Sequence, residues 1–468
     1  MKDTLLVVVD SPTRQTGFSR VGQNLMARWK PYFDRIDVWA FGYSGFPGSP
    51  GTVHENLWQN PPFVLYPATY GNEPWYDVKR LQALLNLILK GDYTHLWIVQ
   101  DHFLLTRNHF TECLDEACRR KNIKSVYYCP VDAPMNPEWA RIVECVDVPV
   151  AYTEYGRQEL IRHVGALPCS PQIGVIPHGV DTSIYRPVSR EERAKLRIKR
   201  TEGWLKEDDL LLIDVNANQR RKDPIRCLEI LAALHRAGHT RFKLLMHMPA
   251  ESLDQISLES AAEQLGLTRG KEWDHTGHLF ESGDGTLAET DVNLLYNMAD
   301  FYLTTTLGEG WGLGITEALA AGLTVLAPDH TACREIADEV SRRGMPSRVI
   351  TLPVEKNFVC VLYDNSRLRR RVDVDRAVEI IGRVQASAQT GWQPHGLNGD
   401  VKYWLSWDRI AHEWMDLFRN SHKRKADYYF EFGGGLGGRV QRPVSPPLVQ
   451  TARQSQRGRT SDRRSDLP

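Results

Sequence analysis

The chain has 468 residues, with 42% hydrophobic residues, 25% charged residues and a formal net charge of zero. This length suits two domains of ordinary size better than one core. The balanced charge gives no overall attraction to nucleic acid or to an anionic membrane. No apolar run approaches the roughly 18 residues of a membrane span. The eight cysteines form no C-x-x-C pair, so we expect a cytoplasmic protein with reduced thiols and no metal site.

Short apolar runs alternate with helical patterns along most of the chain. Strand-like runs in the first half are Leu5–Asp10, Ile36–Phe41, His95–Gln100, Ser125–Pro130 and Val148–Thr153. Those in the second half are Leu210–Val215, Lys243–His247, Phe301–Thr306, Thr324–Pro328 and Val349–Leu352. Continuous apolarity is typical of parallel strands that are covered on both faces. The pattern predicts an α/β protein with two doubly wound, Rossmann-like domains.

The join between the two domains is predicted in the segment Ile173–Asp181. Pro177 fixes one backbone dihedral and Gly179 permits another, so the chain is able to turn sharply here. We therefore expect an N-terminal domain over residues 1–178 and a C-terminal domain over residues 179–400.

Two different segments follow the second domain. Residues Trp404–Asn420 are predicted to form an amphipathic helix, and its apolar side carries Trp407, Ile410, Ala411, Trp414, Leu417 and Phe418. From Ser421 onward the chain has ten Lys or Arg and four Asp or Glu, and it contains the glycine-rich stretch Gly433–Gly438. Residues 421–468 are therefore predicted to be a flexible, disordered basic tail, able to make weak peripheral contact with an anionic surface.

The most informative segment is the glycine-rich stretch Gly308–Gly322, which follows the strand-like run Phe301–Thr306. Glycines occupy positions 308, 310, 312 and 314, so the backbone is able to approach a ligand closely. A short helix is expected over Ile315–Ala321, with Gly322 at its C-terminus. Free N–H groups and the positive end of the dipole make such a helix start an anion site, and phosphate is its usual ligand.

Two glutamates, Glu309 and Glu317, lie on either side of this expected phosphate site. Carboxylates do not bind phosphate, but they accept hydrogen bonds from hydroxyl groups. A nucleotide sugar has a ribose on one side of its diphosphate and a hexose on the other. The spacing therefore favours a nucleotide-sugar site.

A dinucleotide-binding turn is the main alternative for this segment. Its G-x-G-x-x-G pattern fails here, because the third glycine falls on Leu313 in one register and on Ile315 in the other. The next strand ends at Asp329, near the 20-residue offset of a ribose-binding acid. An NAD(P)-dependent oxidoreductase therefore stays open as an alternative.

A second anion site is predicted in Asn216–Pro224, directly after the first strand of the second domain. Asp223 is a favourable N-cap and Pro224 a favourable first helical residue. Lys222 then stands beside the free N–H groups of a helix start, in a position suited to a diphosphate.

The stretch Gly308–Gly322 resembles the E-x7-E motif of retaining GT-B glycosyltransferases of family 4 (group 1). The segments Leu294–Asp300 and Thr324–Pro328 also look like that family. The resemblance covers most of residues 200–420 and is thinner before residue 120.

The resemblance implies a GT-B fold in which two domains face a cleft and the last helix, within residues 401–420, crosses back to the first domain. The first domain would bind an acceptor such as a glycan or a lipid-linked or other hydroxyl compound. The donor would be a nucleotide sugar, UDP- or GDP-linked, with no other cofactor and no metal. Its ribose would bind Glu317, its sugar Glu309, and its diphosphate Lys222 and the amides of Gly310, Trp311, Gly312, Leu313 and Gly314.

The chain departs from the family at one position. Ala217 occupies the place of an arginine that often holds the donor phosphates five positions before the lysine. Arg220 and Arg221 are the candidates to replace it. The missing arginine also leaves open a protein that binds a nucleotide or glycan without turnover.

Several first-domain residues are predicted to face the cleft, because they follow strands of the sheet. Gly17 permits close approach in the loop Ser11–Arg20, where Ser19 is an expected helix cap. His102 is our candidate for the histidine that related enzymes place near the transferred sugar, and Asp101 and Asp132 are the alternatives for binding hydroxyl groups. In the second domain, the cleft candidates are His178, His247, His275 and His278, with the backbone of Thr276, Gly277 and His278 reading the base.

Overall fold

The structure is a computed structural model, and the residues that it describes all belong to the part of the chain Met1–Arg424. It describes residues 3–14, 16–43, 49–50, 63–68, 78–106, 109–164, 173–200, 203–251, 256–276, 287–361, 367–385 and 391–420. The predicted basic tail at 421–468 lies outside the described residues.

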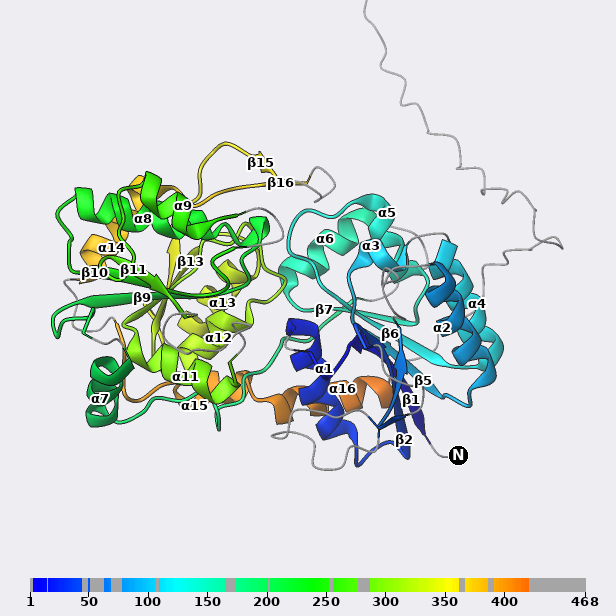
Figure 1. Cartoon of the computed structure of the whole chain (residues 1–468). Coiled ribbons are helices and arrows are strands. Elements are labelled where there is room, and N and C mark those ends of the chain that lie inside the picture. The colour runs from blue at the N-terminus through cyan, green and yellow to red at the C-terminus, as the bar shows by residue number, and fades with distance from the viewer. Residues whose placement is uncertain are drawn as a thin grey trace, which may run out of the picture. The chain divides into compact units, whose positions relative to one another are not determined.

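The first half of the chain forms an eight-stranded sheet with the order β3-β4-β2-β1-β5-β6-β7-β8 (Figure 1). Its strands are β1 (Thr4–Asp10), β2 (Arg35–Phe41), β3 (Ser49–Pro50), β4 (Phe63–Pro67), β5 (His95–Ile98), β6 (Lys124–Cys129), β7 (Val148–Ala151) and β8 (Gly174–Val175). All neighbouring strands pair in parallel except the short edge strand β3, which is antiparallel to β4.

The second half forms a six-stranded parallel sheet with the order β11-β10-β9-β12-β13-β14. Its strands are β9 (Leu210–Val215), β10 (Phe242–His247), β11 (Trp273–His275), β12 (Phe301–Leu303), β13 (Thr324–Pro328) and β14 (Val349–Leu352). A separate antiparallel pair consists of β15 (Val359–Cys360) and β16 (Leu368–Arg369).

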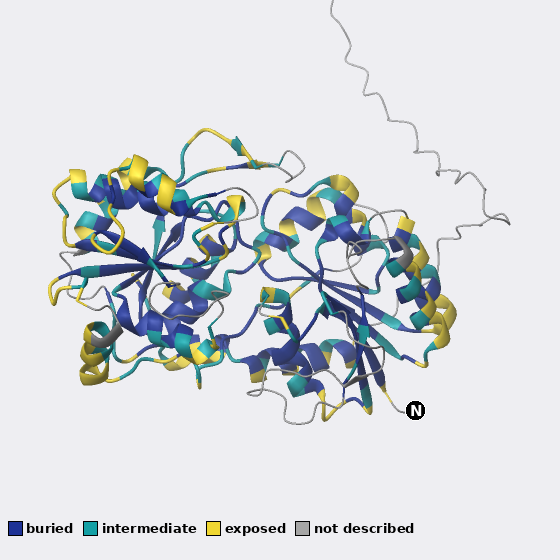
Figure 2. Cartoon of the chain, viewed as in Figure 1, coloured by how far each residue is buried: buried dark blue, intermediate teal, exposed yellow. Residues whose placement is uncertain are grey.

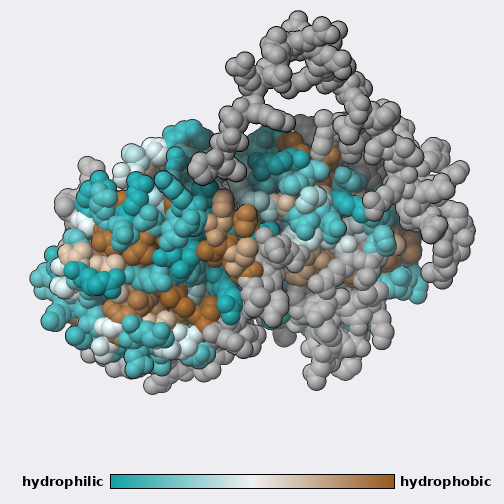
Figure 3. All heavy atoms as spheres, turned by 90° about the horizontal axis from the view of Figure 1, so that it is seen from above, coloured by the Kyte–Doolittle hydropathy of each residue, from teal (hydrophilic) through white to brown (hydrophobic). Residues whose placement is uncertain are grey.

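Helices cover both sheets, so the strands are buried while the outer helix faces are exposed (Figures 1 and 2). The first-domain helices are α1 (Gly17–Trp29), α2 (Val78–Lys90), α3 (His102–Leu105), α4 (Phe110–Lys121), α5 (Pro137–Ala140), η2 (Arg141–Glu144) and α6 (Glu154–Val164). The remaining helices are α7 (Arg190–Arg200), η3 (Arg220–Lys222), α8 (Pro224–Arg236), α9 (Leu258–Gln264), α11 (Glu289–Met298), α12 (Leu313–Ala320), α13 (Thr331–Arg342), α14 (Val374–Gln385), α15 (Gly399–Trp404) and α16 (Trp407–Asn420). Seen from above, the face over the second domain carries mostly hydrophilic side chains with smaller hydrophobic areas (Figure 3).

The predicted fold class is confirmed, since both sheets are doubly wound and all ten predicted strands are present. Most strands that the sequence did not indicate are runs of two or three residues, which are too short to carry an apolar pattern: β3, β8, β11, β15 and β16. The prediction also missed β4, a five-residue strand beside β2. No helix within the described ranges is long and apolar enough to cross a membrane.

The last helix returns to the first domain, as expected. It begins at Trp407 and not at Trp404. Trp404 is instead the last residue of α15, and the non-helical residues Leu405 and Ser406 separate α15 from α16. Trp414 is fully buried, and its ring centroid lies 6.1 Å from that of Trp29 and 4.8 Å from that of Tyr128. The helix is therefore part of the first-domain core.

We expect Trp414→Ala to lower the free energy of unfolding by about 3–5 kcal/mol, because it removes a large buried ring from this cluster. Tyr403→Ala is the matched control, since Tyr403 is 67% exposed and its loss should change stability by under about 0.5 kcal/mol. Urea or thermal unfolding of both variants checks this. Equal stabilities would show that α16 is only loosely docked.

Candidate active site

The candidate active site lies where the strand order reverses in each sheet. In the second sheet, β9 and β12 are neighbours, while the chain leads from β9 to β10 on one side and from β12 to β13 on the other. The first sheet has the same reversal between β1 and β5. Loops at such points diverge and leave a crevice for ligands. Residues from both domains line one cavity of about 1010 Å³ there.

The glycine loop forms one wall of this cavity. A side chain at Gly308 would collide with the backbone carbonyl of Asp132, which belongs to the first domain. Gly312 adopts φ +95° at the N-cap of α12, a backbone region that favours glycine. The glycines therefore permit a close approach between domains and a sharp entry into the helix.

The helix after the loop is α12 (Leu313–Ala320), which begins two residues earlier than predicted. The left-handed Gly312 starts the helix, so the first helical N–H groups are those of Leu313 and Gly314, and both residues line the cavity. Gly322 has φ +94° just after the helix, as expected for its C-terminal position. Trp311 also lines the cavity, but it is 3% exposed and packs on Trp404.

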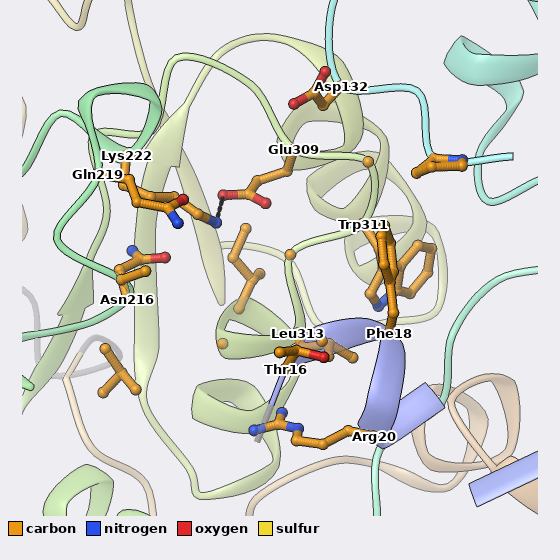
Figure 4. Close-up of a pocket in the computed structure, with 18 of the residues that line it drawn as sticks. Thr16, Phe18, Arg20, Asp132, Asn216, Gln219, Lys222, Glu309, Trp311 and Leu313 are labelled. Atoms are coloured by element: carbon orange, nitrogen blue, oxygen red, sulfur yellow. Dashed lines mark hydrogen bonds and ion pairs between the residues drawn. The ribbon is translucent and has the colours of Figure 1, made fainter. Parts of the chain in front are cut away.

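Glu309 is held by the cations of the turn after β9. Lys222 Nζ donates to Glu309 Oε1 at 2.5 Å, and Arg221 Nη1 lies 3.8 Å from Oε2 (Figure 4). Burial by itself would raise the pKa of Glu309, but Lys222 and Arg221 outweigh it and the pKa is lowered. Glu309 is therefore an ionised carboxylate in the cavity wall.

Asp223 occupies the N-cap position of α8, but it does not cap the helix with its side chain. Its carboxylate accepts two hydrogen bonds from Arg371, at 2.7 and 2.8 Å. The expectation of a side-chain cap was wrong, because a bidentate charge-assisted pair is stronger than one bond from a neutral N–H.

Glu317 lies on the first-domain side of the glycine loop and is 3% exposed. Its Oε2 accepts a hydrogen bond from Tyr296 at 3.1 Å, and its Oε1 forms an ion pair with Arg20 of α1. Both oxygens therefore have protein partners.

The loop after β1 brings Gly17 to the cavity, with α12 next to it. A Cβ atom at Gly17 would lie 3.7 Å from Leu313 Cδ1. Thr16, and not the predicted Ser19, caps α1: Thr16 Oγ1 accepts from the Ser19 N–H at 3.2 Å and donates to Asp10 Oδ2 at 2.6 Å. The helix starts earlier because Asp10 holds the Thr16 hydroxyl in place.

His102 lines the cavity, but both of its ring nitrogens are engaged. Nε2 donates to the Pro130 carbonyl at 2.8 Å, and Nδ1 lies 2.9 Å from the Tyr127 hydroxyl. Burial lowers the pKa of His102 to about 4, so the ring is neutral at physiological pH. Next to it, burial and the charge of Asp132 raise the pKa of Asp101 to about 6.

Asp132 is surrounded by guanidinium groups of the second domain. Its carboxylate lies 3.0 Å from Arg367 Nη1, 3.2 Å from Arg369 Nη2 and 3.3 Å from Arg221 Nε. These arginines outweigh the effect of burial and lower the pKa of Asp132. The position was predicted to bind hydroxyl groups, and the structure shows that the carboxylate already has three cationic partners.

Arg369 also bonds to the backbone of both domains. Its side chain is fully buried, and Nη1 donates to the Asp132 carbonyl at 3.1 Å and to the Leu307 carbonyl at 3.3 Å. Arg221 Nη1 adds a bond to the Gly308 carbonyl at 2.8 Å. We call Asp132, Arg221, Arg367 and Arg369 the arginine cluster, and it ties the glycine loop to the first domain. No local motif marks Arg369 in the sequence, because its partners are far away along the chain.

The turn after β9 places Ala217, Arg220 and Arg221 in the cavity lining. Below it, the fully buried Asp214 accepts a hydrogen bond from Asn216 Nδ2 at 2.6 Å. Burial raises the pKa of Asp214 to about 7, although the bond from Asn216 opposes the shift.

The expected base-reading region is described only in part, because Gly277 and His278 lie outside the described residues. His247 lines the cavity and pairs with Thr276 Oγ1 at 2.9 Å. His178 lines it too, while His275 does not. Asp329, the ribose acid of the oxidoreductase alternative, pairs with Arg334 at 2.6 Å and is absent from the described lining.

Among the described residues, no group of three or more His, Cys, Asp or Glu side chains could hold a metal ion.

No family model matches the chain. A curated relative, the "Putative glycosyltransferase EpsD" of Bacillus subtilis (strain 168), is 26% identical over 198 residues. The alignment covers 42% of this chain and 43% of EpsD, so the chain spans less than half the length of that relative.

Solved structures cover nearly the whole chain. Sucrose-phosphate synthase from Thermosynechococcus elongatus has a TM-score of 0.62 and 15% identity, over 89% of this chain and 98% of that one. A structure described as trehalose-6-phosphate from E. coli bound with UDP-2-fluoro glucose has a TM-score of 0.61 and 13% identity, over 90% of this chain and 100% of that one. Anabaena HepE in complex with UDP has a TM-score of 0.56 and 15% identity, over 88% of this chain and 94% of that one. The chain has a GT-B fold, and the resemblance seen in the sequence is confirmed at this level.

We expect Asp132→Asn to lower the free energy of unfolding by about 3 kcal/mol, because it leaves the fully buried Arg369 guanidinium, and the less buried ones of Arg221 and Arg367, without their carboxylate. Asp408→Asn is the control, since Asp408 pairs with Arg28 but is 82% exposed, and exposed pairs contribute under about 1 kcal/mol. Denaturant unfolding measures both variants. A stability loss for Asp132→Asn no larger than that of the control would contradict the role of the arginine cluster.

Proposed function

We propose that the chain is a glycosyltransferase that moves a sugar from a nucleotide-sugar donor, UDP- or GDP-linked, to an acceptor hydroxyl with retention of anomeric configuration. The observation that carries this proposal is the placement of Glu309 and Glu317 on either side of the N-terminus of α12, in one cavity with Lys222. A diphosphate at the helix start would have one carboxylate towards its ribose and the other towards its sugar.

The donor is held by residues of the second domain in this proposal. Glu317 accepts hydrogen bonds from the ribose hydroxyls, and Glu309 accepts them from the sugar. The amides between Gly310 and Gly314 hold the diphosphate, because N–H groups and the helix dipole favour an anion there. Lys222 lies beside Glu309 and is able to contact both the sugar side and the diphosphate.

The chemical step breaks the bond between the anomeric carbon and the phosphate oxygen and forms a bond from that carbon to the acceptor oxygen. The acceptor proton passes to the departing phosphate on the same face of the sugar. Lys222 and the loop amides stabilise the negative charge of the leaving diphosphate, so the reaction needs no metal. The loop of the first domain with Gly17 covers the donor from the other side.

The first domain supplies the acceptor side. His102 lies beside the transferred sugar with its ring held by Pro130 and Tyr127, so it shapes the site and does not take a proton. Asp101, whose pKa is about 6, binds acceptor hydroxyl groups. Asp132 acts through the arginine cluster. The acceptor is a glycan or a lipid-linked or other hydroxyl compound, and we place the reaction in the cytoplasm.

The comparisons support the nucleotide-sugar class. HepE, which shares the fold, was solved in complex with UDP and with UDP-glucose. EpsD, which shares part of the sequence, is described as a glycosyltransferase.

Two substitutions distinguish the proposed roles of Glu317 and Glu309. Glu317→Ala should weaken the binding of a nucleoside diphosphate by about 1.5–3 kcal/mol, because bonds between ribose and a charged group are lost. Glu309→Gln should leave that binding nearly unchanged and lower turnover, because its contact is to the sugar. Calorimetry with UDP and GDP, together with a donor-turnover assay, measures both effects.

Glu355→Gln is the control, because Glu355 pairs with Arg226 at 2.9 Å and does not line the described cavity. It should change neither quantity. Unchanged nucleotide affinity in a folded Glu317→Ala variant would refute the ribose contact. An equal loss of nucleotide binding and turnover in Glu309→Gln would show that Glu309 contacts the nucleotide and not the sugar.

A further inference from the structure

A first-domain arginine lies over the carboxylate that we assign to ribose. Arg20 is in the first turn of α1 and reaches into the cavity next to Thr16 and Leu313 (Figure 4). Its guanidinium forms an ion pair with Glu317 of α12, and its Nε lies 3.4 Å from Oε1 of Glu289 in α11. One cation of the first domain therefore stands between two carboxylates of the second.

The exposure of these side chains differs. The Glu317 side chain is 4% exposed, while Arg20 is 26% and Glu289 30% exposed. Tyr296 occupies the second oxygen of Glu317. Each carboxylate oxygen accepts more than one hydrogen bond, but the guanidinium covers Oε1 of a side chain that is only 4% exposed. A ribose therefore reaches Glu317 Oε1 only when the guanidinium moves away. Glu289 is a second partner that is already within ion-pair distance and is more accessible.

We propose that Arg20 is a gate: its guanidinium covers the ribose-binding carboxylate of Glu317 and has to move before a ribose binds there. This proposal rests on the function proposed above. In this structure Arg20 holds both Glu317 and Glu289. When a nucleotide binds, the ribose hydroxyls donate to Glu317 and the guanidinium shifts onto Glu289 alone. Arg20 keeps its pair with Glu289, and hydrogen bonds from the ribose and from Tyr296 replace the ion pair at Glu317, so neither charge is left buried without a partner.

The gate has a consequence for affinity. A ligand shifts such an equilibrium by its different affinity for the two states, so the partner preference of Arg20 sets how tightly a nucleotide binds. Because Arg20 lies on α1 and both carboxylates lie in the second domain, nucleotide binding also releases the ionic contact between α1 and α12 and keeps the one between α1 and α11.

The experiment measures nucleoside diphosphate affinity by calorimetry on the full chain, with UDP, GDP and ADP tested separately. Arg20→Met should tighten binding by about fivefold or more, because the competitor for Glu317 is gone. Glu289→Gln should weaken binding by a similar factor, because Arg20 loses its alternative partner. The double variant should bind like Arg20→Met alone, since Glu289 acts only through Arg20.

Arg28→Met is the matched control, because Arg28 is on the same helix and pairs with Asp408. It should leave the affinity unchanged. Weaker binding in Arg20→Met would show that Arg20 is a ligand of the nucleotide and overturn the gate. Unchanged binding in Glu289→Gln, in a chain whose wild type binds nucleotide, would overturn it as well. A wild-type chain that binds none of the three nucleotides overturns both the gate and the proposed function.

Discussion

The contact between the glycine loop and the first domain is the constraint on which the site depends. Gly308 packs so closely on the Asp132 carbonyl that no side chain fits there. The fully buried Arg369 bonds both to that carbonyl and to the Leu307 carbonyl. The position of the loop, and with it the N-terminus of α12, is therefore set by an ionic contact as well as by the second-domain sheet.

Charged side chains of the cavity are paired with one another. Lys222 holds Glu309, Arg20 holds Glu317, and three arginines hold Asp132. Such pairs prevent unpaired buried charge, which would be costly. Donor binding then becomes an exchange of partners, in which hydroxyl groups and phosphates replace side chains. Affinity in this account depends on differences between partners and less on the number of contacts.

The sequence predicted the parts of the protein that rest on local patterns. Continuous apolar runs revealed ten strands of the two sheets, although β4 was missed, and the glycine spacing located the loop between Glu309 and Glu317. The helix caps predicted at Ser19 and at the Asp223 side chain were wrong, because Asp10 and Arg371 decide how Thr16 and Asp223 bond, and neither is indicated by a cap motif. The arginine cluster was missed because Arg367 is 235 residues from Asp132 in the chain. Only the folded topology brings them together.

The most direct test of the central claim is a crystal structure of the protein with bound UDP or GDP. The account predicts the diphosphate at the N-terminus of α12 beside Lys222, with the ribose hydroxyls on Glu317 and the terminal phosphate directed towards Glu309. A nucleotide bound in the reverse direction, with its ribose near Glu309, or bound outside this cavity, would contradict it.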